Sequence, residues 1–323
     1  MKLDAFPRHI ILNSSPLLQR PPPQTGLMTL KKLERLIRAG HGMGHLRAYK
    51  PWLVVTKRVT SSISVNGHSS SPEWGRQHHY RSGDEEDTIQ ILKWLGATDV
   101  RDQYPAWPWE HDHPIVGLPG APKVLRVPGL LSIAKSAGIR HGVYVGTKIP
   151  YVATLDLLST WKLGGTYRVA AHECKPEKIR RDPSPVLRAK ERLQLLKRYC
   201  EAADIARFAG STEDISEILL ANLRDLDPKL SEKERTSIQD SAAYDLVVTH
   251  LARHAYEQSP SNVLAMLSDH HGICHDTLSV AFRLAIWNQD LDHDISTPLE
   301  FSLPLRRGGV ALRSAMRKTW VGF

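Results

Sequence analysis

Three acidic residues and one lysine in this chain are of the types that cut phosphodiester bonds with the help of a metal ion. Glu85 and Asp156 lie far apart in the sequence, and Glu173 and Lys175 follow with a single residue between them. Carboxylate oxygens are the ligands that Mg²⁺ and Mn²⁺ prefer, and such ions stabilise the attacking and leaving oxygens of phosphodiester cleavage. A nearby lysine can orient water or stabilise developing charge. We therefore take Glu85, Asp156 and Glu173 as candidate ligands of one or two Mg²⁺ ions, for which Mn²⁺ can substitute, and Lys175 as their catalytic partner.

Asp156 and Glu173 belong to a predicted β-hairpin. Residues 151–161 and 167–175 have the composition of strands, and the Gly164–Gly165 pair between them favours a tight turn. Because side chains alternate along a strand, every second residue of the second strand shares one inward face: Val169, Ala171, Glu173 and Lys175. A buried charge needs a counter-charge or a metal. The pattern leaves an alternative open, namely a plain Glu–Lys ion pair in this strand beside an exposed Asp156.

Glu85 lies at the start of a predicted amphipathic helix that spans residues 82–95. Glu85 and Ile89 have the i, i+4 spacing of one helix face, so the carboxylate would point toward the core beside the sheet. Ser82 and Glu85 also form the Ser-x-x-Glu pattern of a capping box, in which Glu85 would merely start the helix. The sequence leaves both roles open, and the neighbouring Glu86 is a rival for the chemical one.

The composition favours a globular protein with an anionic partner. The chain has 323 residues, 41% of them hydrophobic, and a formal net charge of +9, which suits a polyanion such as DNA. Its three cysteines show no paired framework, which fits a reducing cytoplasm. No run of 18 apolar residues and no signal-peptide pattern occurs, so we expect a cytoplasmic protein without a membrane partner.

The chain divides into three predicted parts: a Pro-rich tail at residues 1–27, an α/β part at 28–222 and a helical part at 223–323. In the α/β part, a polar stretch at 61–71 predicts a loop. A long helix at 183–204 connects the hairpin to a last short strand, which predicts a mixed sheet flanked by helices.

The predicted helical part has the pattern of a winged-helix-like domain. A helix at 275–288 is followed by a polar, β-like segment at 292–302. We expect this helix to be a DNA-reading or docking element, with Arg283 facing the partner, and the whole part to fold outside the core of the α/β part. The basic residues after Pro304 fit two interpretations equally well. They bind DNA phosphate or a protein partner, or they form a solvated tail.

Ordered segments of the α/β part resemble the TnsA family, the endonuclease subunits of the heteromeric TnsA–TnsB transposases. The segments are RLIRAGHGMGHLRAYKPWLVV (35–55), GRQHHYRSGDEE (75–86), LKWLGATDVRDQYP (92–105), ATLDLL (153–158) and HECKP (172–176). The resemblance implies a restriction-endonuclease-like fold and the site Glu85, Asp156, Glu173 and Lys175. In the family pattern the helix acid lies nine residues before a tryptophan, here Trp94, which selects Glu85 over its neighbour. One departure is Glu173, where the best-known member has glutamine.

The resemblance also implies a division of labour in a bacterial cytoplasm. TnsA-like subunits cut the non-transferred strand at the 5′ ends of the transposon, while a DDE-type, TnsB-like partner cuts and joins the 3′ ends. The implied partners are transposon-end DNA, that DDE transposase subunit and a TnsC-like AAA+ regulator.

Two alternatives remain at the level of the sequence. The first is a stand-alone restriction or repair nuclease with the same acids and no transposase partner. The second is a non-catalytic DNA-binding assembly factor in which the acids are structural.

Overall fold

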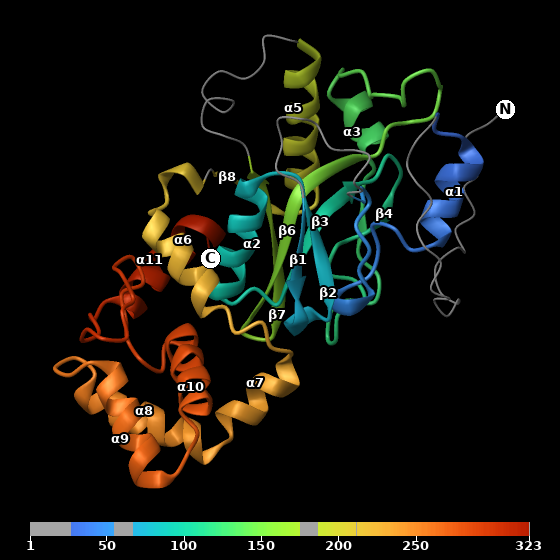
Figure 1. Ribbon diagram of the computed structural model, residues 1–323. Helices are drawn as coiled ribbons and strands as arrows, with labels where there is room; N and C mark the ends of the chain where they lie inside the picture. The colour runs from blue at the N-terminus through green and yellow to red at the C-terminus, as the bar shows by residue number, and fades with distance from the viewer. Residues whose placement is uncertain (1–26, 55–66, 175–186, 211, 323) are drawn as a thin grey trace.

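The computed structural model describes residues 27–54, 67–174, 187–210 and 212–322 (Figure 1). Within these residues the protein is a mixed α/β fold in which a central mixed sheet is flanked by helices. Lys175 and nearly all of the predicted Pro-rich tail lie outside the described residues.

The central sheet has four strands in the order β3-β6-β7-β8: β3 (Asp99–Ala106), β6 (Ala153–Leu163), β7 (Thr166–Cys174) and β8 (Ala206–Gly210). The neighbours β3, β6 and β7 are antiparallel, whereas β8 runs parallel to β7. Gly164 and Gly165 join β6 to β7 with φ angles of 53° and 87°, a left-handed backbone that glycine adopts without strain. The hairpin predicted from the sequence is therefore confirmed.

Helices cover both faces of this sheet (Figure 1). α2 (Gly83–Leu95) packs on one face and buries apolar side chains such as Ile89 and Trp94. α3 (Leu130–Ser136) and α5 (Leu187–Ala202) pack together on the other face, over the hydrophobic cluster that includes Ala171. α5 connects the parallel strands β7 and β8, as the sequence predicts for the mixed sheet.

A short antiparallel hairpin, β1 (Gly67–Ser71) and β2 (Arg76–Tyr80), precedes α2. The prediction of a loop is therefore wrong for residues 67–71, and residues 61–66 lie outside the described residues. The hairpin lacks apolar alternation because its inward side chains are polar and pair with charges on β3. The remaining short elements are α1 (Leu30–Arg38), η1 (Leu46–Ala48), η2 (Pro72–Trp74), β4 (His111–Asp112) and β5 (Arg126–Val127).

The C-terminal region is helical. Its elements are η3 (Thr212–Asp214), α6 (Glu217–Leu226), α7 (Glu232–Gln239), α8 (Ala242–His254), α9 (Pro260–His271), α10 (His275–Asn288) and α11 (Gly309–Val321). α10 has the bounds predicted from the sequence. None of the helices in the described part of the chain is long and apolar enough to cross a membrane.

Two expectations for this region are wrong. No residue in 292–302, all of them described, belongs to a strand, so the predicted wing is absent. Asp294 instead accepts a hydrogen bond from the Ser296 amide at 2.9 Å, and such local bonding favours turns. Arg283 is not free for a partner, because its Nη1 pairs with the carboxylate of Asp225 at 2.6 Å, although its side chain is 36% exposed.

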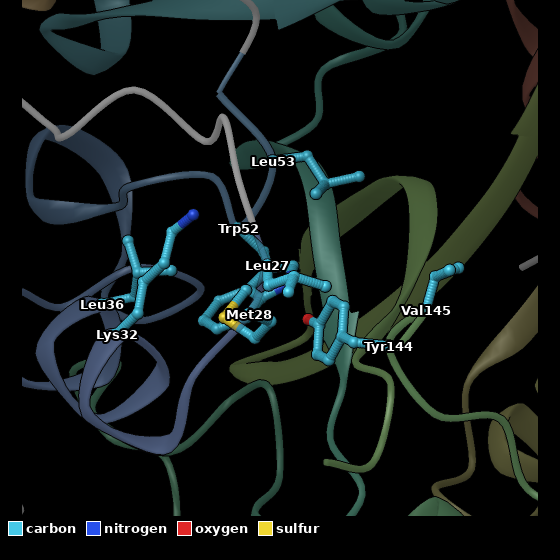
Figure 2. A pocket seen from close by; sticks show the side chains of 8 residues that line it. All are labelled: Leu27, Met28, Lys32, Leu36, Trp52, Leu53, Tyr144 and Val145. Atoms are coloured by element: carbon cyan, nitrogen blue, oxygen red, sulfur yellow. The ribbon is translucent and has the colours of Figure 1, made fainter. Parts of the chain in front are cut away.

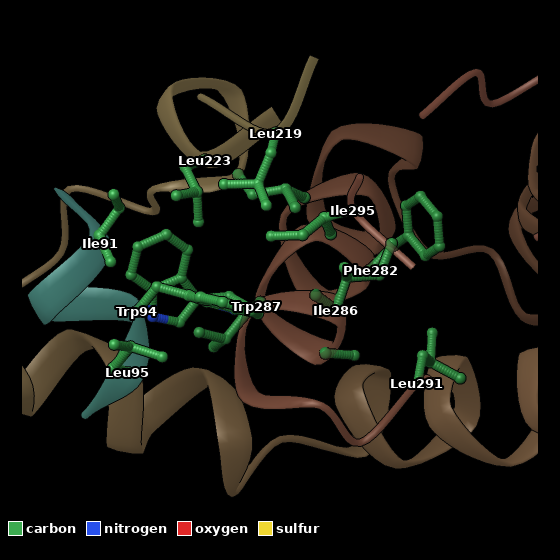
Figure 3. Close-up of a cluster of buried hydrophobic side chains, with 14 of the residues drawn as sticks. Ile91, Trp94, Leu95, Leu219, Leu223, Phe282, Ile286, Trp287, Leu291 and Ile295 are labelled. Carbon is green, nitrogen blue, oxygen red and sulfur yellow. The ribbon is translucent and has the colours of Figure 1, made fainter. Parts of the chain in front are cut away.

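One hydrophobic cluster joins the C-terminal helices to the α/β part (Figure 3). It contains Trp94 and Leu95 of α2 together with Leu223 of α6, Trp287 of α10 and Met316 of α11. The apolar face of α10 is thus part of this core, while His275, Asp276 and Thr277 at its start are exposed. The division at residue 222 stays a prediction, but the side chains on its two sides share this core.

Candidate active site

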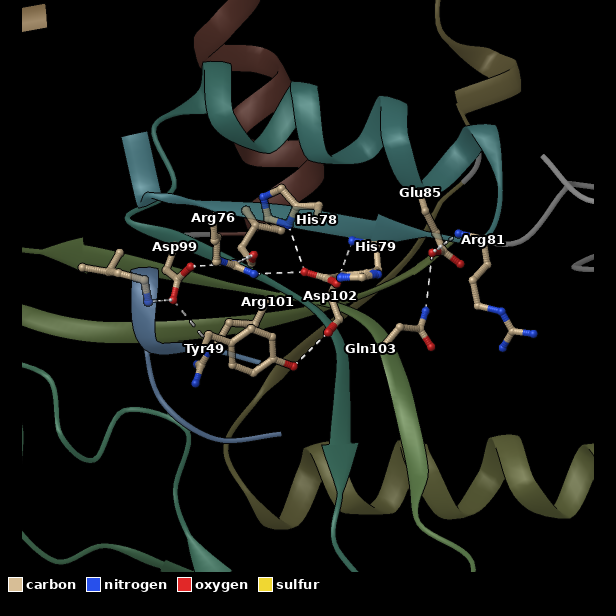
Figure 4. Close-up of polar contacts among 12 residues, drawn as sticks. Tyr49, Arg76, His78, His79, Arg81, Glu85, Asp99, Arg101, Asp102 and Gln103 are labelled. Atoms are coloured by element: carbon tan, nitrogen blue, oxygen red, sulfur yellow. Dashed lines mark hydrogen bonds and ion pairs between the residues drawn. The ribbon is translucent and has the colours of Figure 1, made fainter. Parts of the chain in front are cut away.

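The Glu85 carboxylate is buried where α2 begins. Ser82 Oγ accepts a hydrogen bond from the Glu85 amide at 3.2 Å, which caps the helix. Glu85 Oε2 accepts from the Arg81 amide at 2.9 Å and from Gln103 Nε2, on β3, at 3.4 Å (Figure 4). Only 4% of the residue is exposed. Ser82 therefore caps the helix through the Glu85 amide, while the Glu85 carboxylate bonds the Arg81 amide and reaches the sheet.

The neighbouring Glu86 occupies a different environment. It is half-buried, and its carboxylate pairs with the hydroxyl of Tyr80 on β2, which raises the pKa of Tyr80 together with burial of the ring. Glu85 is therefore the acid of this helix that contacts β3.

Asp156 and Glu173 lie on the adjacent antiparallel strands β6 and β7. The last paired residues there are Leu157 and His172, so Asp156 and Glu173 are the next residues on each strand. Asp156 Oδ2 accepts a hydrogen bond from the Cys174 amide at 3.2 Å. The Asp156 side chain is thereby tied to β7, as the predicted hairpin requires.

Glu173 is engaged by an arginine that the sequence analysis did not single out. Arg207 on β8 donates from Nε and Nη2 to the two carboxylate oxygens of Glu173, each at 2.7 Å. β8 is parallel to β7 and pairs Arg207 with Ala171, which lies two residues before Glu173 on β7, so the guanidinium can reach the Glu173 carboxylate. This bidentate pair is the geometry in which arginine binds carboxylate most strongly. The counter-charge of Glu173 in the described residues is thus Arg207, and Lys175 lies outside them.

A second buried network holds the β1–β2 hairpin on β3 (Figure 4). Asp102 accepts hydrogen bonds from Arg76 Nη1 at 3.0 Å, His78 Nδ1 at 3.0 Å and the His79 amide at 2.9 Å. Burial alone would raise the pKa of Asp102, but these donors and the Arg76 charge hold it at about 2. Burial lowers the pKa of His78, so the neutral ring donates to Asp102. Asp102 precedes Gln103, and the network therefore fixes the strand that carries the contact to Glu85.

The three predicted ligands are held by separate partners and do not form a finished metal cage. In the residues described, no group of three or more His, Cys, Asp or Glu side chains is arranged to hold a metal ion. The donors themselves are carboxylate oxygens, which fit Mg²⁺ or Mn²⁺ and not a zinc site. For Glu173 to bind a cation, its carboxylate would have to share or exchange its contact with Arg207.

A separate cavity of about 330 Å³ does not coincide with these acids (Figure 2). Its lining is mostly apolar and comes from α1 and from two short loops: Leu27, Met28, Lys32, Leu36, Trp52, Leu53, Tyr144 and Val145. None of these lining residues is acidic, so the cavity offers no ligands for a hard cation.

Comparison with known proteins gives one informative relation. No family model matches the chain. The chain is similar to TnsA. That relative is the transposition protein of transposon Tn7 from Escherichia coli, with 28% identity over 193 residues. The match covers 59% of this chain and 60% of TnsA, so the chain spans about three fifths of that relative. TnsA is a transposition protein, and the resemblance found in the segments above agrees with this similarity.

Proposed function

We propose that this protein is the DNA-cutting subunit of a cut-and-paste transposase. The observation that carries the proposal is the buried carboxylate of Glu85, which accepts a hydrogen bond from Gln103 of β3. Gln103 lies across from Asp156 in the pairing of β3 with β6. A buried acid beside a second acid on the sheet edge suits a site for a hard cation. The similarity to a transposition protein supplies the biological setting.

In this proposal Glu85 and Asp156 hold Mg²⁺, and Glu173 joins them by exchanging its contact with Arg207. The bound ion would lower the pKa of a water molecule and stabilise charge on the phosphate. Lys175 comes two residues after Glu173 in the sequence and would orient the attacking water. Glu85 and Asp156 contribute the carboxylate oxygens. The contacts with Gln103 and with the Cys174 amide orient these two side chains.

The proposed division of labour follows the TnsA resemblance. This subunit would cut the non-transferred strand at the 5′ ends of a transposon, and a DDE-type partner would cut and join the 3′ ends. An AAA+ regulator would activate the pair. The net charge of +9 favours the transposon-end DNA as the substrate.

A strand-specific cleavage assay tests the proposal. Transposon-end DNA labelled on each strand is incubated with this protein, its proposed DDE-type transposase partner and Mg²⁺. We expect cuts at the 5′ ends that disappear with Glu85→Gln and with Asp156→Asn and persist with Glu86→Gln. Cuts at the 5′ ends that survive both Glu85→Gln and Asp156→Asn would refute the assigned site.

One observation favours a second function, that of a non-catalytic assembly factor. The bidentate pair between Glu173 and Arg207 is a complete structural interaction that needs no metal. In that case the wild-type protein leaves 5′ ends uncut with the transposase present, yet raises binding of the transposase to the DNA ends. Cutting by the protein alone, without a transposase, would instead indicate a stand-alone nuclease.

A further inference from the structure

We infer that Gln103 is a positioning residue of this site, whose side-chain amide sets the Glu85 carboxylate relative to Asp156. This inference rests on the proposed function and adds a residue to it. Gln103 is 2% exposed and lies in the middle of β3. Three features single it out: its backbone conformation, its place in the sheet register and the two contacts of its amide.

The backbone of Gln103 adopts a conformation that glutamine avoids. Its φ angle is 50°, in the left-handed region that disfavours side chains with a Cβ. Its carbonyl accepts a hydrogen bond from the Trp52 amide at 3.3 Å, and Gln103 is absent from the paired positions of β3 and β6. Such conformations persist where surrounding contacts enforce them, and they concentrate at functional sites.

Near Gln103 the side chains of β3 change from one face of the sheet to the other. Val100 belongs to the hydrophobic cluster on the α2 side, whereas Tyr104 belongs to the cluster on the α3 and α5 side. Regular alternation would place residues four apart on the same face. The change of face therefore occurs between them, where Gln103 has its left-handed backbone, and it allows the Gln103 side chain to reach Glu85 of α2 (Figure 4).

The adjacent strand changes face at the same level. The sheet pairs Asp102 with Leu157 and Tyr104 with Leu155, so Gln103 lies across from Asp156. Leu157 packs on the α2 side and Leu155 on the opposite side, although they are two residues apart. Both strands thus change face at the same pair of positions, Gln103 on β3 and the proposed ligand Asp156 on β6.

The two contacts of the Gln103 amide fix its orientation. Thr154 Oγ1 donates to Gln103 Oε1 at 3.3 Å, which directs the amide nitrogen to the other side. That nitrogen donates to Glu85 Oε2 at 3.4 Å. The amide therefore bridges α2 and β6, and it sets the direction in which the Glu85 carboxylate points. Groups that orient metal-binding side chains in this way strongly affect metal affinity.

Mn²⁺ binding to the full-length protein, measured by electron paramagnetic resonance, tests this role without DNA or turnover. Gln103→Asn keeps an amide and tolerates the left-handed backbone, but its side chain is one methylene too short to reach Glu85. We expect its Mn²⁺ affinity to fall roughly 10- to 100-fold. Gln289 supplies a matched control, because it is a glutamine with a φ of 70° at the end of α10. Gln289→Asn should bind Mn²⁺ as the wild type does.

A second variant leaves the strained backbone untouched. Thr154→Val removes the hydroxyl that orients the amide, and it should weaken Mn²⁺ binding less than Gln103→Asn, with Thr154→Ser restoring it. In cleavage, Gln103→Asn should raise the Mn²⁺ concentration needed for half-maximal rate and approach the wild-type rate at saturation. Wild-type Mn²⁺ affinity in both Gln103→Asn and Thr154→Val would overturn the inference.

The same assay separates this inference from the proposed function. Glu85→Gln and Asp156→Asn should each abolish Mn²⁺ binding and cleavage if these acids hold the ion. Retention of both properties in these two variants refutes the proposed site. Loss in these two variants, with unchanged Mn²⁺ binding in the Gln103 and Thr154 variants, refutes the positioning role alone.

Discussion

At the scale of single residues, the pair between Glu173 and Arg207 decides how the second half of the site is held. Glu173 is 8% exposed, and both of its oxygens bond the guanidinium at 2.7 Å. A carboxylate that loses such a partner while buried keeps its desolvation penalty. Arginine is also poorly replaced by lysine here, because lysine cannot form two parallel hydrogen bonds.

We therefore expect Arg207→Gln to lower the free energy of unfolding by about 1–3 kcal/mol. Arg207→Lys should recover part of that loss, and the double variant Arg207→Gln with Glu173→Gln should lose less than the sum. Urea unfolding of the wild type, Arg207→Gln, Glu173→Gln and the double variant measures the coupling. As a control, Arg126→Gln removes an arginine whose side chain is 40% exposed, and it should change stability by less than about 1 kcal/mol. Equal effects at the two arginines would contradict the buried-pair account.

A half-buried histidine remote from the acids, His111, gives the protein a pH-dependent stability. His111 Nε2 hydrogen-bonds the hydroxyl of Tyr199 at 2.9 Å, and its Nδ1 lies 2.9 Å from the Trp109 carbonyl. Burial lowers the pKa of His111 to about 4. In the unfolded chain the ring has its ordinary pKa near 6.5. Between the two pKa values the ring is therefore protonated in the unfolded state and neutral in the folded state.

The stability of the folded state should consequently fall as the pH drops from about 6.5 to about 4. We expect His111 to contribute roughly 1 kcal/mol per pH unit in this window. Chemical unfolding at several pH values, for the wild type and for His111→Gln, measures the difference. The variant is expected to show the shallower slope, and parallel slopes would show that another group is responsible.

At the scale of elements, a buried lysine anchors α2 to the C-terminal region. Lys93 lies in the last turn of α2 and is 7% exposed. Its Nζ pairs with the carboxylate of Asp227, just after α6, at 2.7 Å and with that of Glu73 at 2.9 Å. The Asp227 side chain is fully buried, so its charge depends on this contact.

Lys93→Met keeps the length of the side chain and removes the charge. We expect it to lower the free energy of unfolding by about 3 kcal/mol, because Asp227 is left as an unpaired buried charge. Adding Asp227→Asn should restore part of this loss. Thermal and urea unfolding measure both variants, and a single Lys93→Met protein as stable as the wild type would show that the α2–α6 contact does not depend on the ion pair.

At the scale of the whole molecule, α2 and the C-terminal helices stabilise each other through one hydrophobic cluster. Ile91, Trp94 and Leu95 of α2 are at most 1% exposed, and they share this cluster with α6, α10 and α11 (Figure 3). Arg313 of α11 also lies over the ring of Trp94, at 5.5 Å from its centre. The helix that carries Glu85 therefore depends on residues beyond 222.

Deletion of residues 223–323 should leave a protein that fails to fold or that aggregates, because it exposes the apolar face of α2 to water. The sequence predicts that the helical part folds outside the core of the α/β part, but residues of both parts share one hydrophobic cluster. Circular dichroism and gel filtration of the truncated protein test it. A monomeric truncated protein with a cooperative unfolding transition would show that the α/β part folds alone.

The sequence by itself determined the elements that depend on near neighbours. The Gly164–Gly165 turn, the β6–β7 hairpin, α2 and the bounds of α10 follow from turn chemistry, helix capping and side-chain period, which act over a few residues. The same local patterns identified the acids Glu85, Asp156 and Glu173 as candidates.

Only the tertiary structure decided which of these residues meet. The parallel pairing of β8 brings Arg207 to Glu173, and the left-handed backbone of Gln103 brings its amide to Glu85. The winged-helix pattern was misleading because the apolar face of α10 fits a core helix as well as an exposed reading helix. Strand register, ion-pair partners and burial depend on contacts between residues distant in the chain, and no local period records those contacts.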